Sequence, residues 1–342
     1  MKSIMASKRQ KLFLLYYISR ASLFGLGYSR MFALTKQDTW ISAMIGLGIG
    51  LIIVFMISKI MNNKKYINNK IIICILIILY SFFISEELTT LMNFMTSFFL
   101  LNTPNYIISL AAIIVSLYVV SKGIKSILRT GEIVFYFNIF ITITTLVILC
   151  SYINISHLFP ILDSSVTSIV KSSIIFALYT TIPLINLLNL ENKGQGLTKM
   201  YLISSLTIIM LIICVLGIFG PRLTEILRFP EYIVLKRIKL LSFIEKIESI
   251  LSITYIIDNL MLIIISTYNI KYLVKDNKIA FYVIILVTYL FSAIIINGNY
   301  INALKIYYIT PYIFIIGLIL IIYYFINSIK KKPKASYIQR DT

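Results

Sequence analysis

Long apolar runs follow one another along almost the whole chain, and no other feature limits its possible folds so strongly. Ten runs reach the length, about 17–25 residues, that a helix needs to cross the hydrocarbon layer of a membrane. They lie at about 12–34, 41–58, 71–100, 105–121, 132–152, 166–190, 199–219, 249–270, 279–297 and 307–328. A backbone in lipid must satisfy its own hydrogen bonds, as a helix does. The sequence predicts an all-α membrane protein of about ten transmembrane helices.

The composition supports a single polytopic membrane domain over residues 1–342. The chain is 59% hydrophobic and only 13% charged. The surface of a soluble protein of this size must be largely polar, and this sequence has too few polar residues to cover it. The lipid bilayer is therefore expected to be the main partner of its surface.

The formal net charge of +19 is distributed in short clusters between the apolar runs. This is how a membrane protein fixes its orientation, whereas nucleic-acid binding needs a continuous basic face. We therefore expect no nucleic-acid partner, and we expect both termini and a basic tail at 329–342 to be cytoplasmic. The clusters on that side are Lys59, Lys64, Lys65 and Lys70; Lys122, Lys125 and Arg129; Lys193 and Lys199; Lys271, Lys275 and Lys278; and Lys330, Lys331, Lys332, Lys334 and Arg340.

One long segment, residues 220–248, interrupts this pattern on the predicted outer side. It has mixed charge and apolar residues at helical spacing. An amphipathic helix lying in the outer interface fits this pattern, and a surface that binds a partner is the alternative. The predicted apolar face holds Leu235, Ile238, Leu241 and Ile244, and Lys236, Arg237 and Lys239 lie elsewhere.

Ionisable residues at membrane depth are costly, so they are candidates for function. Arg20 lies in the first run, Glu86 and Glu87 in the third, and Asp258 in the eighth. Opposite charges at similar depth should pair, and we expect Arg20 to pair with Glu86, Glu87 or Asp258. Such a pair could serve a ligand or a coupling proton, or it could only hold helices together.

The first and sixth runs each contain residues that interrupt a helix. Glycine permits unusual backbone conformations in the first run, and Pro183 removes a hydrogen bond in the sixth. Interruptions at corresponding places in two halves of five helices indicate the substrate site of an inverted-repeat transporter, although close helix packing is the alternative. We expect the halves at about 12–152 and 166–328. The candidate ligand-binding residues are Gly25, Gly27, Tyr28, Ser29, Tyr179, Thr180 and Thr181.

Enzymatic chemistry has no support in the sequence. Cys74, Cys150 and Cys214 lie inside apolar runs, and the lone histidine, His157, lies in a predicted outer loop. None has the spacing of a metal site. There is no phosphate-binding loop and no catalytic triad, so we expect no enzyme activity, no metal and no cofactor.

Several short segments, in order and spacing, resemble the spore germination permease family, the B subunits of germinant receptors. They are KRQKLFLLYYISRASLFGLGYSR (8–30), KQDTWIS (36–42), Thr103-Pro104, SKGIKSILRTGEIVF (121–135), ISHLFPIL (155–162) and FPEYIVLKRIKLLSFIEKIESI (229–250). The resemblance extends over most of the chain. Individually the segments are short and mostly apolar, so their combination carries the specificity.

The resemblance implies a five-plus-five inverted repeat of the amino acid–polyamine–organocation superfamily, with broken helices 1 and 6. It also implies a receptor subunit of the spore inner membrane that binds a small germinant, such as an amino acid, and acts with A-type and C-type subunits. In that superfamily the two breaks bind the ligand. Here they map onto Gly25, Gly27, Tyr28 and Ser29, and onto 179–181.

Two ligand-binding functions follow as expectations, and a purely structural membrane scaffold that binds no ligand is the third alternative. In the first, a small polar germinant binds at mid-membrane, and partner subunits read out the change in conformation. A zwitterionic amino acid suits such a site. The N-terminus of a half-helix attracts its carboxylate, and its amine is attracted by an acidic side chain and by backbone carbonyls that the interruption leaves without hydrogen bonds. In the second, the chain is a proton-coupled amino-acid permease in which Glu86, Glu87 or Asp258 carries the proton.

Overall fold

The computed structural model describes residues 7–62, 70–190, 194–237, 247–275, 277–297 and 300–330. In these ranges the regular elements are all helical. The α-helices are α1 (Lys8–Ala21), α2 (Leu26–Thr35), α3 (Thr39–Asn62), α4 (Lys70–Phe98), α5 (Asn105–Ser121), α6 (Ile124–Cys150), α7 (Val166–Thr181), α8 (Leu197–Ile226), α9 (Pro230–Ile233), α10 (Ile247–Leu273), α11 (Lys278–Asn297) and α12 (Tyr300–Lys330). Short 3₁₀ helices are η1 (Lys36–Asp38), η2 (Ile155–Leu158), η3 (Ile182–Leu187) and η4 (Val234–Arg237).

The prediction of an all-helical membrane protein is confirmed. Seven helical stretches in the described residues are long and apolar enough to cross a membrane, and α5 and the first part of α11 are shorter apolar helices. One of the seven stretches, Leu26–Asn62, joins α2 and α3. The count of ten spans and the five-plus-five repeat stay predictions.

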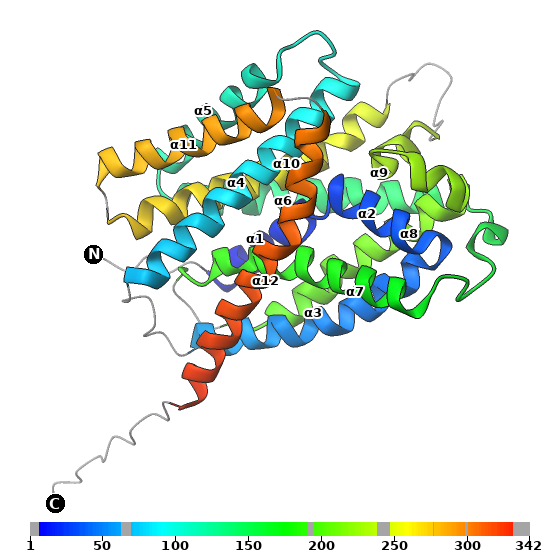
Figure 1. Ribbon diagram of the computed structural model, residues 1–342, viewed down its shortest axis with the longest axis horizontal. Coiled ribbons are helices and arrows are strands. Elements are labelled where there is room, and N and C mark those ends of the chain that lie inside the picture. The colour runs from blue at the N-terminus through cyan, green and yellow to red at the C-terminus, as the bar shows by residue number, and fades with distance from the viewer. Residues whose placement is uncertain are drawn as a thin grey trace, which may run out of the picture.

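Helix α1 lies in the middle of the bundle (Figure 1). All eight residues from Leu14 to Ala21 are buried, whichever way they point from the helix axis. A helix that is covered on every side must pack against several others, and α1 contacts α6, α8 and α10. This position of α1 places the charged side chain of Arg20 inside the protein.

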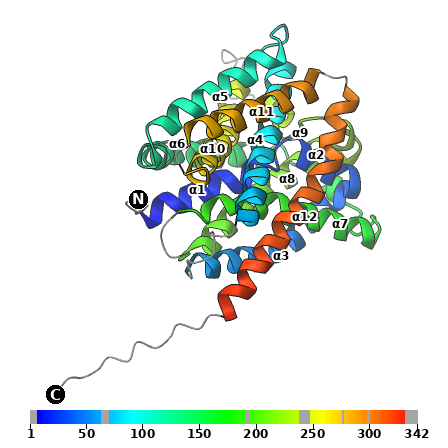
Figure 2. The same ribbon diagram turned by 60° about the vertical axis from the view of Figure 1, so that its left-hand side comes forward.

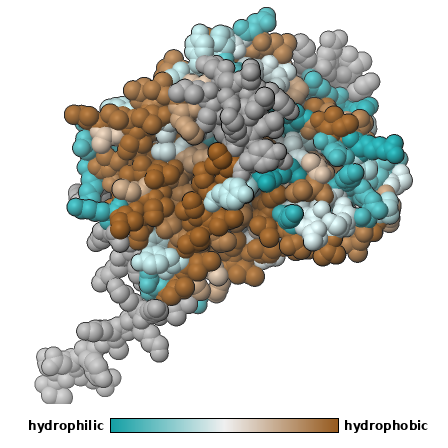
Figure 3. Space-filling model, in the orientation of Figure 1, coloured by the Kyte–Doolittle hydropathy of each residue, from teal (hydrophilic) through white to brown (hydrophobic). Residues whose placement is uncertain are grey.

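The outer helices expose apolar side chains. On α6, Ile133, Phe140 and Val147 follow one another at seven-residue spacing on one face, and each is more than half exposed. Figure 3 shows hydrophobic side chains covering much of one face of the molecule. Figure 2 shows α5, α11 and α12 on the outside of the bundle. Exposed apolar surface on this scale indicates contact with lipid.

The predicted outer segment at 220–248 has a different structure over its described part. Residues 220–226 continue α8 after a kink at Gly220, whose φ is +73°. The chain then turns inward, and Phe229, Glu231 and Leu235 are buried. Aromatic side chains hold it there, because Phe229 packs against Phe24 with ring centroids 5.6 Å apart. Residues 238–246 lie outside the described part of the chain, so a surface helix there stays a prediction.

Candidate functional site

Arg20 forms an ion pair inside the protein with Asp258 of α10. The Arg20 Nε and Asp258 Oδ2 atoms are 3.0 Å apart, and both side chains are at least nine-tenths buried. Of the three acids that the sequence offered as partners, the structure brings Asp258 to Arg20. The ion pair joins the central helix α1 to α10.

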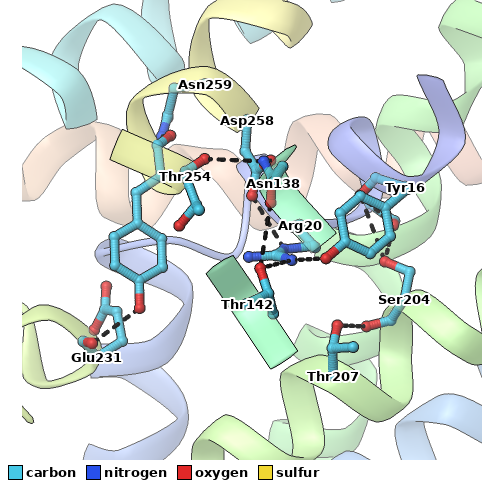
Figure 4. A network of polar contacts seen from close by, with 12 residues as sticks. Tyr16, Arg20, Asn138, Thr142, Ser204, Thr207, Glu231, Thr254, Asp258 and Asn259 are labelled. Carbon is cyan, nitrogen blue, oxygen red and sulfur yellow. Dashed lines mark hydrogen bonds and ion pairs between the residues drawn. The ribbon is translucent and has the colours of Figure 1, made fainter. Parts of the chain in front are cut away.

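A ring of hydrogen bonds surrounds this ion pair (Figure 4). Arg20 Nη1 donates to the hydroxyls of Tyr16 and Thr142, the second at 3.2 Å. Thr142 donates to the amide oxygen of Asn138 at 3.2 Å, and Asn138 Nδ2 donates to Asp258 Oδ1 at 2.9 Å. Both carboxylate oxygens of Asp258 therefore have partners, as a buried charge requires.

Three helices supply this ring, and two of them do so through residues four positions apart. Tyr16 and Arg20 lie on α1, Asn138 and Thr142 lie on α6, and α10 contributes Asp258. Residues at this spacing are neighbours on one helix face. Each helix therefore presents a short polar patch to the others in an otherwise apolar interior.

A cavity of about 30 Å³ lies beside the ion pair. A water needs about 10–15 Å³ of such volume, so there is room for about two. Its polar lining comes from Arg20, Tyr28, Tyr255 and four threonines, Thr142, Thr145, Thr207 and Thr254. Leu235 is among the apolar residues that line it. Polar donors and acceptors on several helices converge here, as they do in ligand sites.

The first span is interrupted next to this cavity. Helix α1 ends at Ala21 and α2 begins at Leu26, with Gly25 between them at φ +72°. A residue with a Cβ rarely adopts this conformation. The buried carboxylate of Glu231 accepts a hydrogen bond from the Gly25 N–H, with Oε1 2.7 Å from the nitrogen.

Two further acids approach the interruptions from α4. Glu87 Oε1 accepts a hydrogen bond from the Ser22 hydroxyl at 3.0 Å. Both carboxyl oxygens of Glu86 are buried without a hydrogen-bond partner among the described residues. Glu86 lies within electrostatic reach of Glu87 and of Tyr179.

The sixth span also changes conformation where the sequence predicted. Helix α7 ends at Thr181 and continues as the 3₁₀ helix η3, which contains Pro183. The hydroxyl of Thr181 donates to the Ala177 carbonyl at 2.6 Å, and Thr180 shares a hydrogen bond of 2.7 Å with Tyr201. These contacts satisfy the hydroxyl groups of both threonines inside the protein.

The two interruptions lie against each other. A Cβ on Gly27 would come within 3.3 Å of the Tyr179 ring. The predicted ligand residues nevertheless differ in their surroundings: Tyr28 lines the cavity, whereas Ser29 donates to the Arg228 carbonyl at 2.8 Å. Thr180 and Thr181 bond within the protein.

Sequence reasoning missed Glu231 and the polar residues of α6. Glu231 follows Phe229 and Pro230, a pattern that favours a helix start, and this signal could have placed the glutamate in a first helical turn. Asn138 and Thr142 carry no charge, so the pattern of ionisable residues inside apolar runs does not identify them.

No three His, Cys, Asp or Glu side chains in the described ranges cluster as a metal site would require.

Comparison with known proteins gives a single finding about the family. The family model described as spore germination protein, a spore permease, matches residues 12–301. A search of curated proteins finds no match to this chain. The matched range contains the ion pair, the cavity and both interruptions.

Proposed function

The chain belongs to the spore germination permease family, and on this premise we propose that it is the B-type subunit of a germinant receptor, located in the spore inner membrane. In this proposal a small polar germinant, an amino acid, binds at mid-membrane beside the interruption of the first span. The change in conformation is passed to A-type and C-type partner subunits. Family membership also favours a transport-like or receptor role over an enzymatic one.

One observation carries the proposal. The interruption between α1 and α2 adjoins a polar cavity that a buried arginine and several hydroxyls line. Irregular backbone at membrane depth is tolerated where it is buried in protein or lines a cavity, and transporters use such places to bind substrates. The side chains proposed to take part are Arg20 and Tyr28.

Ligand binding by the purified full-length protein tests this proposal. The protein in lipid nanodiscs would be titrated with each of the twenty standard amino acids, with thermal unfolding and calorimetry as readouts. At least one amino acid should raise the melting temperature in a saturable way, because a ligand that binds only the folded state stabilises it. Absence of binding by all twenty would overturn the proposal.

A proton-coupled amino-acid permease is the second candidate, and the position of Glu86 favours it. Acidic side chains at membrane depth mark proton relays in pumps and transporters, and both carboxyl oxygens of Glu86 are buried without a hydrogen-bond partner among the described residues. Vesicles that contain the protein would distinguish the two functions. Uptake of a bound labelled amino acid that a protonophore abolishes would favour the permease, and binding without uptake would favour the receptor.

A further inference from the structure

We propose that Arg20 and Tyr28, rather than the backbone at the start of α2, bind the carboxylate of the amino acid, an inference that rests on the proposed function. The sequence had suggested the opposite arrangement, with the carboxylate at a half-helix N-terminus. Three observations decide between the two positions: the occupant of the α2 N-terminus, the uncommitted donors of the cavity, and the charge already present there.

The N-terminus of α2 already holds a carboxylate. Glu231 Oε1 lies 2.7 Å from the Gly25 nitrogen, and the other oxygen of this carboxylate, Oε2, is buried without a partner among the described residues. A helix N-terminus attracts a negative charge through its free N–H groups and its dipole. Because the protein supplies that group from its own chain, a ligand carboxylate would meet a like charge there.

The cavity, by contrast, contains two donors that the protein leaves uncommitted. The hydrogen bonds and the ion pair of Arg20 use Nη1 and Nε, and Nη2 makes no hydrogen bond to a described residue. One terminal nitrogen of Arg20 points away from Tyr16, on the side of Glu231 (Figure 4). The hydroxyl of Tyr28 likewise has no hydrogen-bond partner in the described part of the chain, and both side chains line the cavity.

Two donors match the two oxygens of one carboxylate. Arginine binds carboxylates well because its planar nitrogens donate in a fixed geometry. The cavity of about 30 Å³ has room for such a group. Leu235 of η4 supplies part of its apolar lining, beside which the rest of the ligand would lie.

The charge balance of the site then selects a zwitterion. Asp258 already neutralises Arg20, and the buried carboxylate of Glu231 lies within electrostatic reach of Tyr28. A simple carboxylate would therefore add a further unbalanced negative charge to the interior. Burying an unbalanced charge is very unfavourable. An amino acid carries its own ammonium group, and its net charge is zero.

A comparison of ligands on the unmodified protein tests the inference first. Each standard amino acid that binds would be compared with its α-carboxamide, which keeps the ammonium group and lacks the carboxylate charge. The carboxamide should bind at least about tenfold more weakly, because a hydrogen bond to a charged group contributes more than a neutral one. Equal affinities would overturn the carboxylate assignment and leave the proposed function intact, whereas binding of neither class would overturn both.

Variants then locate the carboxylate. Tyr28→Phe removes one donor and should weaken binding of the amino acid about two- to tenfold with little effect on its carboxamide. Tyr118→Phe, at an exposed position of α5, is the matched control. The double variant Arg20→Gln with Asp258→Asn removes the charges together, so no unpaired charge remains buried. It should abolish the preference for the amino acid over its carboxamide.

Two further variants complete the test. Lys36→Gln with Glu225→Gln neutralises an exposed ion pair and should leave the preference unchanged. Glu231→Gln is combined with Tyr28→Phe, because the Glu231 charge also reaches Tyr28 and its loss alone would favour a carboxylate at either position. If the carboxylate binds Arg20 and Tyr28, Tyr28→Phe should weaken amino-acid binding in the Glu231→Gln background as it does in the unmodified protein. If the carboxylate binds the α2 N-terminus, Tyr28→Phe should have no effect in that background, and this result would overturn the inference.

Discussion

At the scale of single residues, Gly25 determines the geometry of the interruption. Its φ of +72° lies in a region that residues with a Cβ rarely adopt. A Cβ at this position would also lie 2.7 Å from Cε1 of Phe229. Gly25 therefore allows both the break in helical conformation between α1 and α2 and the close approach of the segment that carries Glu231.

Alanine substitutions at two glycines test this interpretation. Gly25→Ala should lower the free energy of unfolding by about 1–3 kcal/mol, because it combines a strained backbone with a steric clash. Gly48→Ala is the matched control: a Cβ there would meet nothing within 4 Å, and the residue lies within α3. The control should be neutral or stabilising by up to about 1 kcal/mol. Equal effects in thermal or denaturant unfolding would contradict the special role of Gly25.

At the scale of elements, the 3₁₀ helix η3 depends on α10 for hydrogen-bond partners. Asn269 of α10 donates to the backbone carbonyl of Asn186 at 2.9 Å and to its side-chain oxygen at 2.8 Å. Ser266 donates to the same side-chain oxygen at 3.2 Å. Because Pro183 prevents a continuous α-helix at this point, side chains of another helix satisfy the buried polar groups of η3.

The substitution Asn269→Leu should loosen this connection. The buried carbonyl of Asn186 then loses the hydrogen bond from Asn269. An unsatisfied buried polar group lowers the free energy of unfolding by about 1–3 kcal/mol. Tyr272→Leu, at a partly exposed position on the same helix, should change stability by less than about 1 kcal/mol. Melting temperatures of the two purified variants provide the comparison. If Asn269→Leu melted like the unmodified protein, the dependence of η3 on α10 would be wrong.

At the scale of the whole molecule, the distribution of exposed apolar residues separates the lipid-facing surface from the interior. Exposed apolar side chains occur on α5, α6, α11 and α12, whereas the residues of α1 from Leu14 to Ala21 are buried. The bundle thus encloses a central helix, α1, whose buried Arg20 is neutralised within the protein by Asp258. The orientation of the bundle in the membrane rests on the positions of its basic loops.

Labelling of single cysteines tests this orientation. In a background with Cys74, Cys150 and Cys214 replaced by alanine, Asn102→Cys should react with a membrane-impermeant maleimide on intact cells. Lys122→Cys should react only after permeabilisation, because it belongs to a loop predicted to be cytoplasmic. Both positions are exposed at opposite ends of α5. The reverse pattern of labelling would overturn the predicted orientation.

The sequence alone was enough to establish a helical membrane protein and the two places where its helices are interrupted. Both results depend only on neighbouring residues in the chain. Apolar runs of membrane length must form helices, glycine permits a non-helical backbone, and proline removes a helical hydrogen bond. Gly25 and Pro183 therefore had their effects where the sequence placed them. The candidate acids were also evident, since ionisable residues inside apolar runs are rare.

Only the tertiary structure decided which of these groups meet. Glu86, Glu87 and Asp258 all lie near the middle of apolar runs, so depth along the chain could not select the partner of Arg20. The rotation of each helix about its axis and the packing between helices determine which acid contacts Arg20. They brought Asp258 to Arg20, placed Glu87 on Ser22, and brought Glu231 from a distant segment to Gly25. The partner of a buried charge depends on contacts between helices, and a hydrophobic pattern does not encode them.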